Sequence, residues 1–213
     1  MNRPDNMNAE EFRKWWANFE GHNYKPLTRA LRKIVESCPS QARVLDIGSG
    51  AGRVMQALQE KGCVCTGLDI SPGNVQYATD LGLDVHLTDV DRLVDEKHKL
   101  LAGPYDVVIF SRVLAYIAQK NELFSQLNPK IVYIYEGQQA SLAHFRSRAE
   151  PKMRFRIKGK EYPGVYLSPR GYSAWMAQYG FGSSQVLHWN ANPSKLPFVQ
   201  LLRSSSVAMK FAR

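Results

Sequence analysis

Short apolar runs alternate with helical stretches through the middle of the chain. Runs such as Val107–Phe110 and Ile131–Ile134 are apolar at every position, which is typical of strands covered on both faces. The stretches between such runs carry apolar residues at helical spacing. We expect strands at 43–48, 63–69, 84–88, 105–110 and 130–136, and helices at 52–61, 72–81, 90–101 and 114–126. This alternation predicts an α/β fold built on a parallel sheet with right-handed crossovers.

Two helices are predicted ahead of the first strand. The first spans Glu10–Phe19, where four aromatic residues recur at helical spacing, and the second begins at Pro26 and ends at Ser37. These side chains can pack residues 1–42 onto the rest of the domain. Alternatively, the segment forms a helical lid over a ligand, and Tyr24 reaches into the site.

The alternation stops after Glu136, and the rest of the chain is organised differently. Residues 138–167 are irregular and basic, and we interpret them as an insertion or cap. A helix is expected from Pro169 to a stop at Gly180. Two further strands are expected to form a hairpin at the sheet edge, at 183–189 and 198–204, joined by a turn at 190–194. One domain spanning residues 1–213 would hold all of these elements.

The composition is that of an ordinary soluble globule, with 44% hydrophobic and 22% charged residues. No apolar run approaches the roughly 18 residues that a membrane span needs, and the N-terminus lacks the apolar segment of a secretory signal. Cys63 and Cys65 would share one face of a strand, so a metal pair is conceivable, but no His or Cys lies near them in sequence. We therefore expect them and Cys38 to be buried reduced thiols, with no metal site, in a cytoplasmic protein.

Positive charge is concentrated in the last third of the chain. The net charge is +9, yet residues 1–137 hold 16 Lys and Arg against 17 Asp and Glu, and residues 138–213 hold 12 against 2. Within that region, Lys152–Lys160 alternates basic and apolar residues, which predicts a strand that turns into a second strand at 161–167. The basic hairpin could attract an anionic substrate such as a carboxylate, a phosphate or RNA. It could equally be an edge strand whose charges prevent aggregation.

A glycine-rich turn follows the first predicted strand. Asp46 ends the apolar run, and glycines then occupy positions 48, 50 and 52 before a helix. Glycines at a strand-to-helix turn allow positive φ angles and let a ligand approach bare backbone. The dinucleotide fingerprint G-x-G-x-x-G would need a third glycine where Arg53 stands, so that type of site is disfavoured. Asp69 and Asp89 end the next two strands, where each could contact a ligand or simply cap a helix.

Together these segments resemble the class I S-adenosylmethionine (SAM) dependent methyltransferases, in particular the small-molecule group that includes ubiquinone-biosynthesis enzymes. The matching segments are Val44–Gly52, Gly67–Ser71, Thr88–Asp89 and Tyr105–Ile117. The resemblance implies a Rossmann-like, seven-stranded, mostly parallel sheet with helices on both faces and an antiparallel last strand. It also implies SAM as cofactor and S-adenosylhomocysteine (SAH) as product.

The resemblance also assigns roles to the cofactor-binding residues. The glycine turn, through Gly48, Gly50 and Gly52, would hold the methionine part of SAM, and Asp46 would organise the turn and the ammonium. Asp69 would bind the ribose and Asp89 the adenine, with Ile70 and Val90 beside them. Ser111 and Arg112 would border the sulfonium.

The methyl acceptor is less well defined by the sequence. Methyl transfer from a sulfonium is an in-line displacement in which positioning alone can supply about 7–11 kcal/mol. Tyr116, His144 and His188 are the candidate catalytic groups, although either histidine can instead be structural. We expect O-methylation of a small anionic or hydroxylated metabolite. An RNA methyltransferase, favoured by the basic C-terminal third, and a non-catalytic SAM-binding partner protein are the alternatives.

Overall fold

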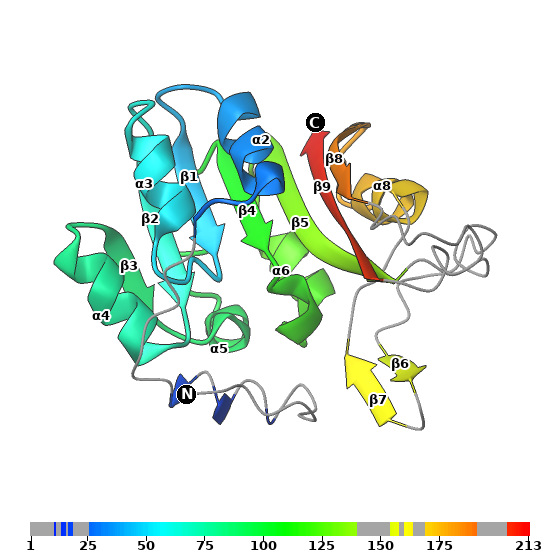
Figure 1. Ribbon diagram of the computed structural model, residues 1–213, viewed down its shortest axis with the longest axis horizontal. Helices are drawn as coiled ribbons and strands as arrows, with labels where there is room; N and C mark the ends of the chain where they lie inside the picture. Colours follow the sequence, from blue (N-terminus) through cyan, green and yellow to red (C-terminus); the bar gives the residue numbers. More distant parts are fainter. Residues whose placement is uncertain are drawn as a thin grey trace.

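The computed structural model is built around one central sheet with helices on both faces (Figure 1). The structure describes residues 11, 14, 15, 17, 18, 26–139, 154–157, 160–163, 169–190 and 204–213. The helices are α2 (Arg29–Ser37), α3 (Arg53–Gln59), α4 (Pro72–Asp80), α5 (Val90–Asp95), the short 3-10 helix η1 (Leu114–Tyr116), α6 (Lys120–Gln126) and α8 (Pro169–Ala177). The strands of the sheet are β1 (Arg43–Ile47), β2 (Val64–Asp69), β3 (Asp84–Leu87), β4 (Val107–Ser111), β5 (Ile131–Gln139), β8 (Ser183–Asn190) and β9 (Ser204–Ala212).

The strand order of the sheet confirms the fold prediction. It is β3-β2-β1-β4-β5-β9-β8, with β1 to β5 parallel and β9 antiparallel to β5. The chain adds β2 and β3 on one side of β1 and then crosses to add β4 and β5 on the other. In open α/β sheets, the carboxyl ends of the strands at such a reversal form the crevice in which ligands bind. The topology therefore places a candidate site beyond the ends of β1 and β4.

Two apolar clusters, one on each face, hold the layers together. Within β4, Val107 and Ile109 belong to one cluster, and Val108 and Phe110 belong to the other. The first cluster includes side chains of α2, α3 and α4, and the second includes side chains of α5, α6 and α8. A strand buried on both faces must be apolar at every position, which explains the runs seen in the sequence.

Two helices are shorter than the sequence predicts. The helix expected at 90–101 ends at Asp95, and Lys97 has a φ angle of 46°, which an α-helix cannot continue. The helix expected at 114–126 is broken into η1 and α6. A carboxylate on a neighbouring helix causes the break, because Asp91 accepts hydrogen bonds from the backbone N–H groups of Ala118 (3.0 Å) and Gln119 (3.0 Å). These bonds start α6 afresh at Lys120.

The last strand of the sheet continues beyond the range predicted from the sequence. A strand was expected at 198–204, but β9 spans Ser204–Ala212. In this register Val207, Met209 and Phe211 face one apolar cluster and Ala208 faces the other. Residues 198–203 of the expected strand and 191–194 of the expected turn lie outside the described residues, and Asn190 is the last residue of β8. The predicted hairpin at the sheet edge is confirmed, because β8 and β9 pair antiparallel and β8 is the edge strand.

The predicted basic hairpin also forms. Strands β6 (Arg154–Ile157) and β7 (Lys160–Pro163) pair antiparallel as a separate two-stranded sheet. Only part of the expected N-terminal helix, residues 11, 14, 15 and 17, is described, and these residues are helical. The lid role of residues 1–42, including Tyr24, stays a prediction, as does the capping role of residues 138–167.

Candidate functional site

The glycine turn between β1 and α3 has the backbone geometry that the sequence predicts. Gly48, Gly50 and Gly52 have φ angles of 74°, 55° and 76°. A Cβ built on Gly50 would meet no atom within 4 Å, so the backbone there is bare toward open space. A Cβ built on Gly52 would lie 2.2 Å from Leu83 Cδ1. Gly50 thus leaves room for a ligand, whereas Gly52 lets α3 pack closely against the loop before β3.

A cavity of about 490 Å³ opens beside this turn, at the carboxyl ends of the strands. Its volume is in the range of small-molecule sites. Most of the residues expected to bind a cofactor or act in catalysis line it: Asp46, Gly48, Gly50, Asp69, Ile70, Asp89, Val90, Ser111, Arg112 and Tyr116. Gly52 does not line it, so its role is in packing rather than in ligand contact. Residues from four segments distant in sequence are therefore gathered around one space.

Asp46 is a buried acid whose hydrogen bonding is incomplete. Its side chain is 1% exposed, and neither its Oδ1 nor the Oγ of Ser49 has a hydrogen-bond partner. Burial, reinforced by the nearby charge of Asp69, raises the pKa of Asp46 to about 7. Buried polar atoms nearly always have partners. Two unpaired oxygens in the wall of one cavity are therefore positioned to accept hydrogen bonds from a ligand, and a cation there would favour the charged form of Asp46.

Asp69 links the glycine turn to the next helix. One carboxylate oxygen accepts from the backbone N–H of Gly50 at 2.8 Å, and the other accepts from the N–H of Ser71 at 2.8 Å. Ser71 in turn caps the N-terminus of α4. Burial raises the pKa of Asp69, although the bonds from Ser71 and Gly50 oppose the shift. Each carboxylate oxygen can accept more than one hydrogen bond, so Asp69 keeps acceptor capacity for hydroxyls in the cavity.

Asp89 caps a helix and also lines the cavity, the two positions considered for it from the sequence. It is the N-cap residue of α5, and its Oδ1 accepts from the N–H of Asp91 at 3.1 Å. It also lines the cavity, between Thr88 and Val90. Asp46, Asp69 and Asp89 thus lie at the carboxyl ends of three adjacent strands: Asp46 is the second-last residue of β1, Asp69 ends β2, and Asp89 follows β3. The row places three carboxylates around one cavity.

The other side of the cavity has a different chemistry. Ser111 ends β4, and Arg112 follows with a φ angle of 57°, which is rare for a residue with a side chain. Its N–H donates to the carbonyl of Tyr135 at 2.7 Å, and its guanidinium lies 5.3 Å from the centre of the Tyr135 ring. Val113 and Ile117 add apolar surface to the same wall.

The three candidate catalytic residues are placed differently. Tyr116, in η1, lines the cavity. His188 lies in β8, separated from β4 by β5 and β9, and is not among the residues that line the cavity. His144 lies outside the residues that the structure describes. Tyr116 is therefore the one of the three that the described structure brings beside the acids.

Several lining residues were not singled out from the sequence. Ser49, Asn74 and Tyr135 line the cavity, as do Thr28 and Leu31 at the start of α2. Asn74 donates a side-chain hydrogen bond to Asp69, which adds to the bonds that stabilise its charge. Tyr135 pairs with Ser111 across β4 and β5, so its position could have been predicted once strand register was known. No motif marks Thr28 or Leu31.

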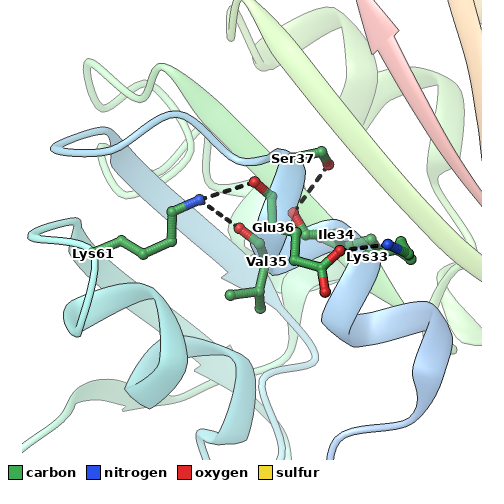
Figure 2. A network of polar contacts seen from close by, with 6 residues as sticks. All are labelled: Lys33, Ile34, Val35, Glu36, Ser37 and Lys61. Atoms are coloured by element: carbon green, nitrogen blue, oxygen red, sulfur yellow. Dashed lines mark hydrogen bonds and ion pairs between the residues drawn. The ribbon is translucent and has the colours of Figure 1, made fainter.

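The α2 helix, which brings these two residues to the cavity, is fixed at its opposite end by Lys61. The Lys61 ammonium donates to the carbonyls of Val35 (2.7 Å), Glu36 (3.2 Å) and Cys38 (2.5 Å). Figure 2 shows the first two of these bonds reaching the last turn of α2. A cation at a helix C-terminus satisfies carbonyls that have no partner in the helix and complements its dipole. The C-terminal end of α2 is therefore anchored to the segment after α3.

Within the described part of the chain, no group of three His, Cys, Asp or Glu side chains is arranged to hold a metal ion. Cys38, Cys63 and Cys65 are all buried and free. None of the described helices has the length and apolar character needed to cross a membrane.

Comparison with known proteins indicates the chemistry associated with this architecture. The sequence model of a family described as "Methyltransferase domain" matches residues 16–182. A curated protein named ubiquinone biosynthesis O-methyltransferase, from Vibrio campbellii, is 27% identical over 132 residues, which are 55% of this chain and 55% of that protein. The chain thus spans about half the length of the curated relatives it matches.

Solved structures share the fold at low sequence identity. The N-terminal domain of EvdMO1, solved with SAH bound, has a TM-score of 0.60 and 15% identity, and the match covers 99% of this chain and 100% of that one. SpnF, described as a [4+2]-cyclase, has a TM-score of 0.59 and 11% identity, with 98% of this chain and 97% of that one covered. The fold is therefore common to proteins that are described by different reactions.

Proposed function

Because the chain belongs to the family of methyltransferase domains, whose model matches residues 16–182, we propose that it is a SAM-dependent methyltransferase acting on a small molecule. The observation that carries this proposal is the row of acids at three adjacent strand ends, with Asp46 buried and incompletely bonded beside bare backbone at Gly50. A cofactor that carries an ammonium, a ribose diol and an adenine amine would complete these contacts.

The residues would divide the binding work among the parts of the cofactor. Asp46 and the glycine turn would hold the methionine part, Asp69 would accept from the ribose hydroxyls, and Asp89 would accept from the adenine amine. The cavity walls formed by Ile70 and Val90 would pack against the base. When bound, SAM supplies an electrophilic methyl group on a positively charged sulfur.

The remaining task of the protein is to orient the acceptor. In-line displacement needs the acceptor atom held opposite the leaving sulfur, and positioning of this kind can lower the barrier by about 7–11 kcal/mol. Tyr116, which lines the cavity, would hydrogen-bond the acceptor through its hydroxyl and orient it toward the methyl group. Residues of β4 and η1, including Ser111, would exclude water from the reacting atoms.

Oxygen is the acceptor atom that we propose. The support is the similarity to proteins named as O-methyltransferases, which covers about half of their length. The volume of the cavity, about 490 Å³, is in the range of sites that bind small molecules. The basic C-terminal third would then attract an anionic acceptor to the site, a role that stays a prediction.

Calorimetry with SAM and SAH tests the cofactor assignment. Asp69→Asn and Asp69→Ala should weaken SAH binding roughly 10-fold to 100-fold, because hydrogen bonds to a charged group contribute about 1.5–3 kcal/mol. Asp80→Ala is the matched control, since Asp80 is an exposed acid on α4 that does not line the cavity. Unchanged SAH affinity in both Asp69 variants would contradict the assignment.

Transfer of a labelled methyl group from SAM separates the remaining alternatives. Label in the low-molecular-mass fraction of a cell extract would support the proposal. Label in RNA would overturn the small-molecule acceptor in favour of an RNA methyltransferase. Tight SAM binding with no transfer to either fraction would favour a non-catalytic partner protein or another reaction.

A further inference from the structure

We propose that Arg112, stacked on Tyr135, binds a carboxylate of the methyl acceptor, so that the acceptor is an organic acid with an apolar body. This inference rests on the proposed function and deepens it, because it names the class of substrate and the residue that selects it.

Arg53, the first residue of α3, also lines the cavity, and the other charged side chains of its wall are sorted along the edge of the sheet. Asp46, Asp69 and Asp89 lie at β1, β2 and β3, whereas Arg112 follows β4 and Tyr135 lies in β5. Neighbouring strands are about 4.8 Å apart, so this order separates an acidic half from a basic half across the reversal point. The acidic half suits the cationic cofactor. A guanidinium in the other half suits an anionic partner.

The guanidinium of Arg112 is held in place but not neutralised. It lies over the Tyr135 ring, and its Nη2 is 3.4 Å from the Tyr135 hydroxyl. Among the described residues, no carboxylate lies within ion-pairing distance of it. By contrast, Arg92 on α5 pairs with Glu96 at 2.6 Å. Arg112 therefore offers free donors in a fork geometry that matches a carboxylate.

The backbone at this position is unfavourable without a functional reason. A φ angle of 57° at Arg112 places a residue with a Cβ in the left-handed region, which costs about 1–2 kcal/mol. Glycine or asparagine would be tolerated better there. Such outliers are concentrated at ligand-binding positions, where the surrounding structure holds them. Here the N–H of Arg112 donates to the Tyr135 carbonyl, which extends the β4–β5 ladder and keeps the side chain over the ring.

The charge of Arg112, a residue exposed to solvent, also acts on both substrates. The methyl donor carries a positive sulfonium, and an unpaired guanidinium in the same cavity would repel it. An acceptor carboxylate would remove that repulsion and bring its own reacting group to the cavity. Val113 and Ile117, on the same wall, provide apolar contact for the rest of the acceptor.

The test uses benzoate as the probe acid and benzamide as its neutral isostere, each titrated by ligand-observed NMR into the SAH-loaded protein. Arg112→Asn removes the guanidinium and tolerates the positive φ angle, so it should fold. It should weaken benzoate binding at least 10-fold and leave benzamide binding within 2-fold. Arg92→Gln is the matched control and should bind both probes as the wild-type protein does.

The possible outcomes separate this inference from the proposed function. Equal benzoate affinity in Arg112→Asn and wild type, or no benzoate binding by the wild-type protein, would overturn the acceptor assignment while SAH binding stands. Loss of SAH binding in Arg112→Asn would also overturn it, because the guanidinium would then hold the cofactor. A wild-type protein that does not bind SAH would refute the proposed function itself, and this inference with it.

Discussion

Replacing Asp46 by Asn should change how the stability of the ligand-free protein depends on pH. Burial raises the pKa of Asp46 to about 7 from an ordinary value of 3.8. The folded protein therefore binds a proton that the unfolded chain has already lost. The free energy of unfolding must fall as pH rises through this interval and level off above the folded pKa.

The size of the effect follows from the difference between the folded and unfolded pKa values of Asp46. At 1.36 kcal/mol for each pKa unit, Asp46 should account for a loss of about 3 kcal/mol of unfolding free energy between pH 5 and pH 8.5. In Asp46→Asn this contribution is absent. The unfolding free energy of the variant should still decrease between the two pH values, because the raised pKa of Asp69 contributes to it. This decrease should be smaller than that of the wild-type protein by about the contribution of Asp46.

Urea unfolding of both proteins at pH 5 and pH 8.5 measures the difference directly. Comparing each protein with itself at the two pH values cancels the cost of burying the new amide. Asp106→Asn is the control, because its hydrogen bond to Lys130 lowers the pKa of Asp106, so that its titration lies below pH 5. A wild-type decrease that is unchanged in Asp46→Asn would refute the reasoning that Asp46 is an uncompensated buried acid.

Two further substitutions test the supports of the site. Lys61→Met should lower the free energy of unfolding by about 2 kcal/mol in thermal denaturation, because the last carbonyls of α2 lose a charged donor. Lys33→Met is the control and should change this free energy by no more than about 0.5 kcal/mol, because it breaks only the exposed ion pair with Glu36. Gly52→Ala should cost roughly 2–4 kcal/mol, since the new Cβ would lie 2.2 Å from Leu83 Cδ1. Gly62→Ala shares the φ angle of 76° but has 3.6 Å of clearance, so an equal loss there would contradict the steric explanation.

The order of the elements could be predicted from the sequence because each signal is local. A strand covered on both faces has to be apolar throughout, as in Val107–Phe110, and a helix must present one apolar side. Glycine residues mark the turns, as between Gly48 and Gly52. These requirements do not depend on which distant segment packs against the element, so a single sequence reveals them.

The errors arose where a distant partner decides the local structure. The break between η1 and α6 depends on Asp91, which lies far away in sequence. The extent of β9 to Ala212 depends on its pairing with β5 and on its packing into the two clusters, which the local sequence does not reveal. Tyr135 was missed for the same reason, since strand pairing, not its own sequence context, brings it over Arg112.

The contact of Asp91 with the start of α6 has a consequence for how the two substrates meet. Asp91 comes two residues after Asp89, the acid proposed to hold adenine, and it binds the amides of Ala118 and Gln119 directly after the segment that carries Tyr116. The helix after Asp89 and the segment after Tyr116 are therefore fastened to each other by one carboxylate. Asp91 thus sets the distance between two walls of the cavity that are far apart in sequence.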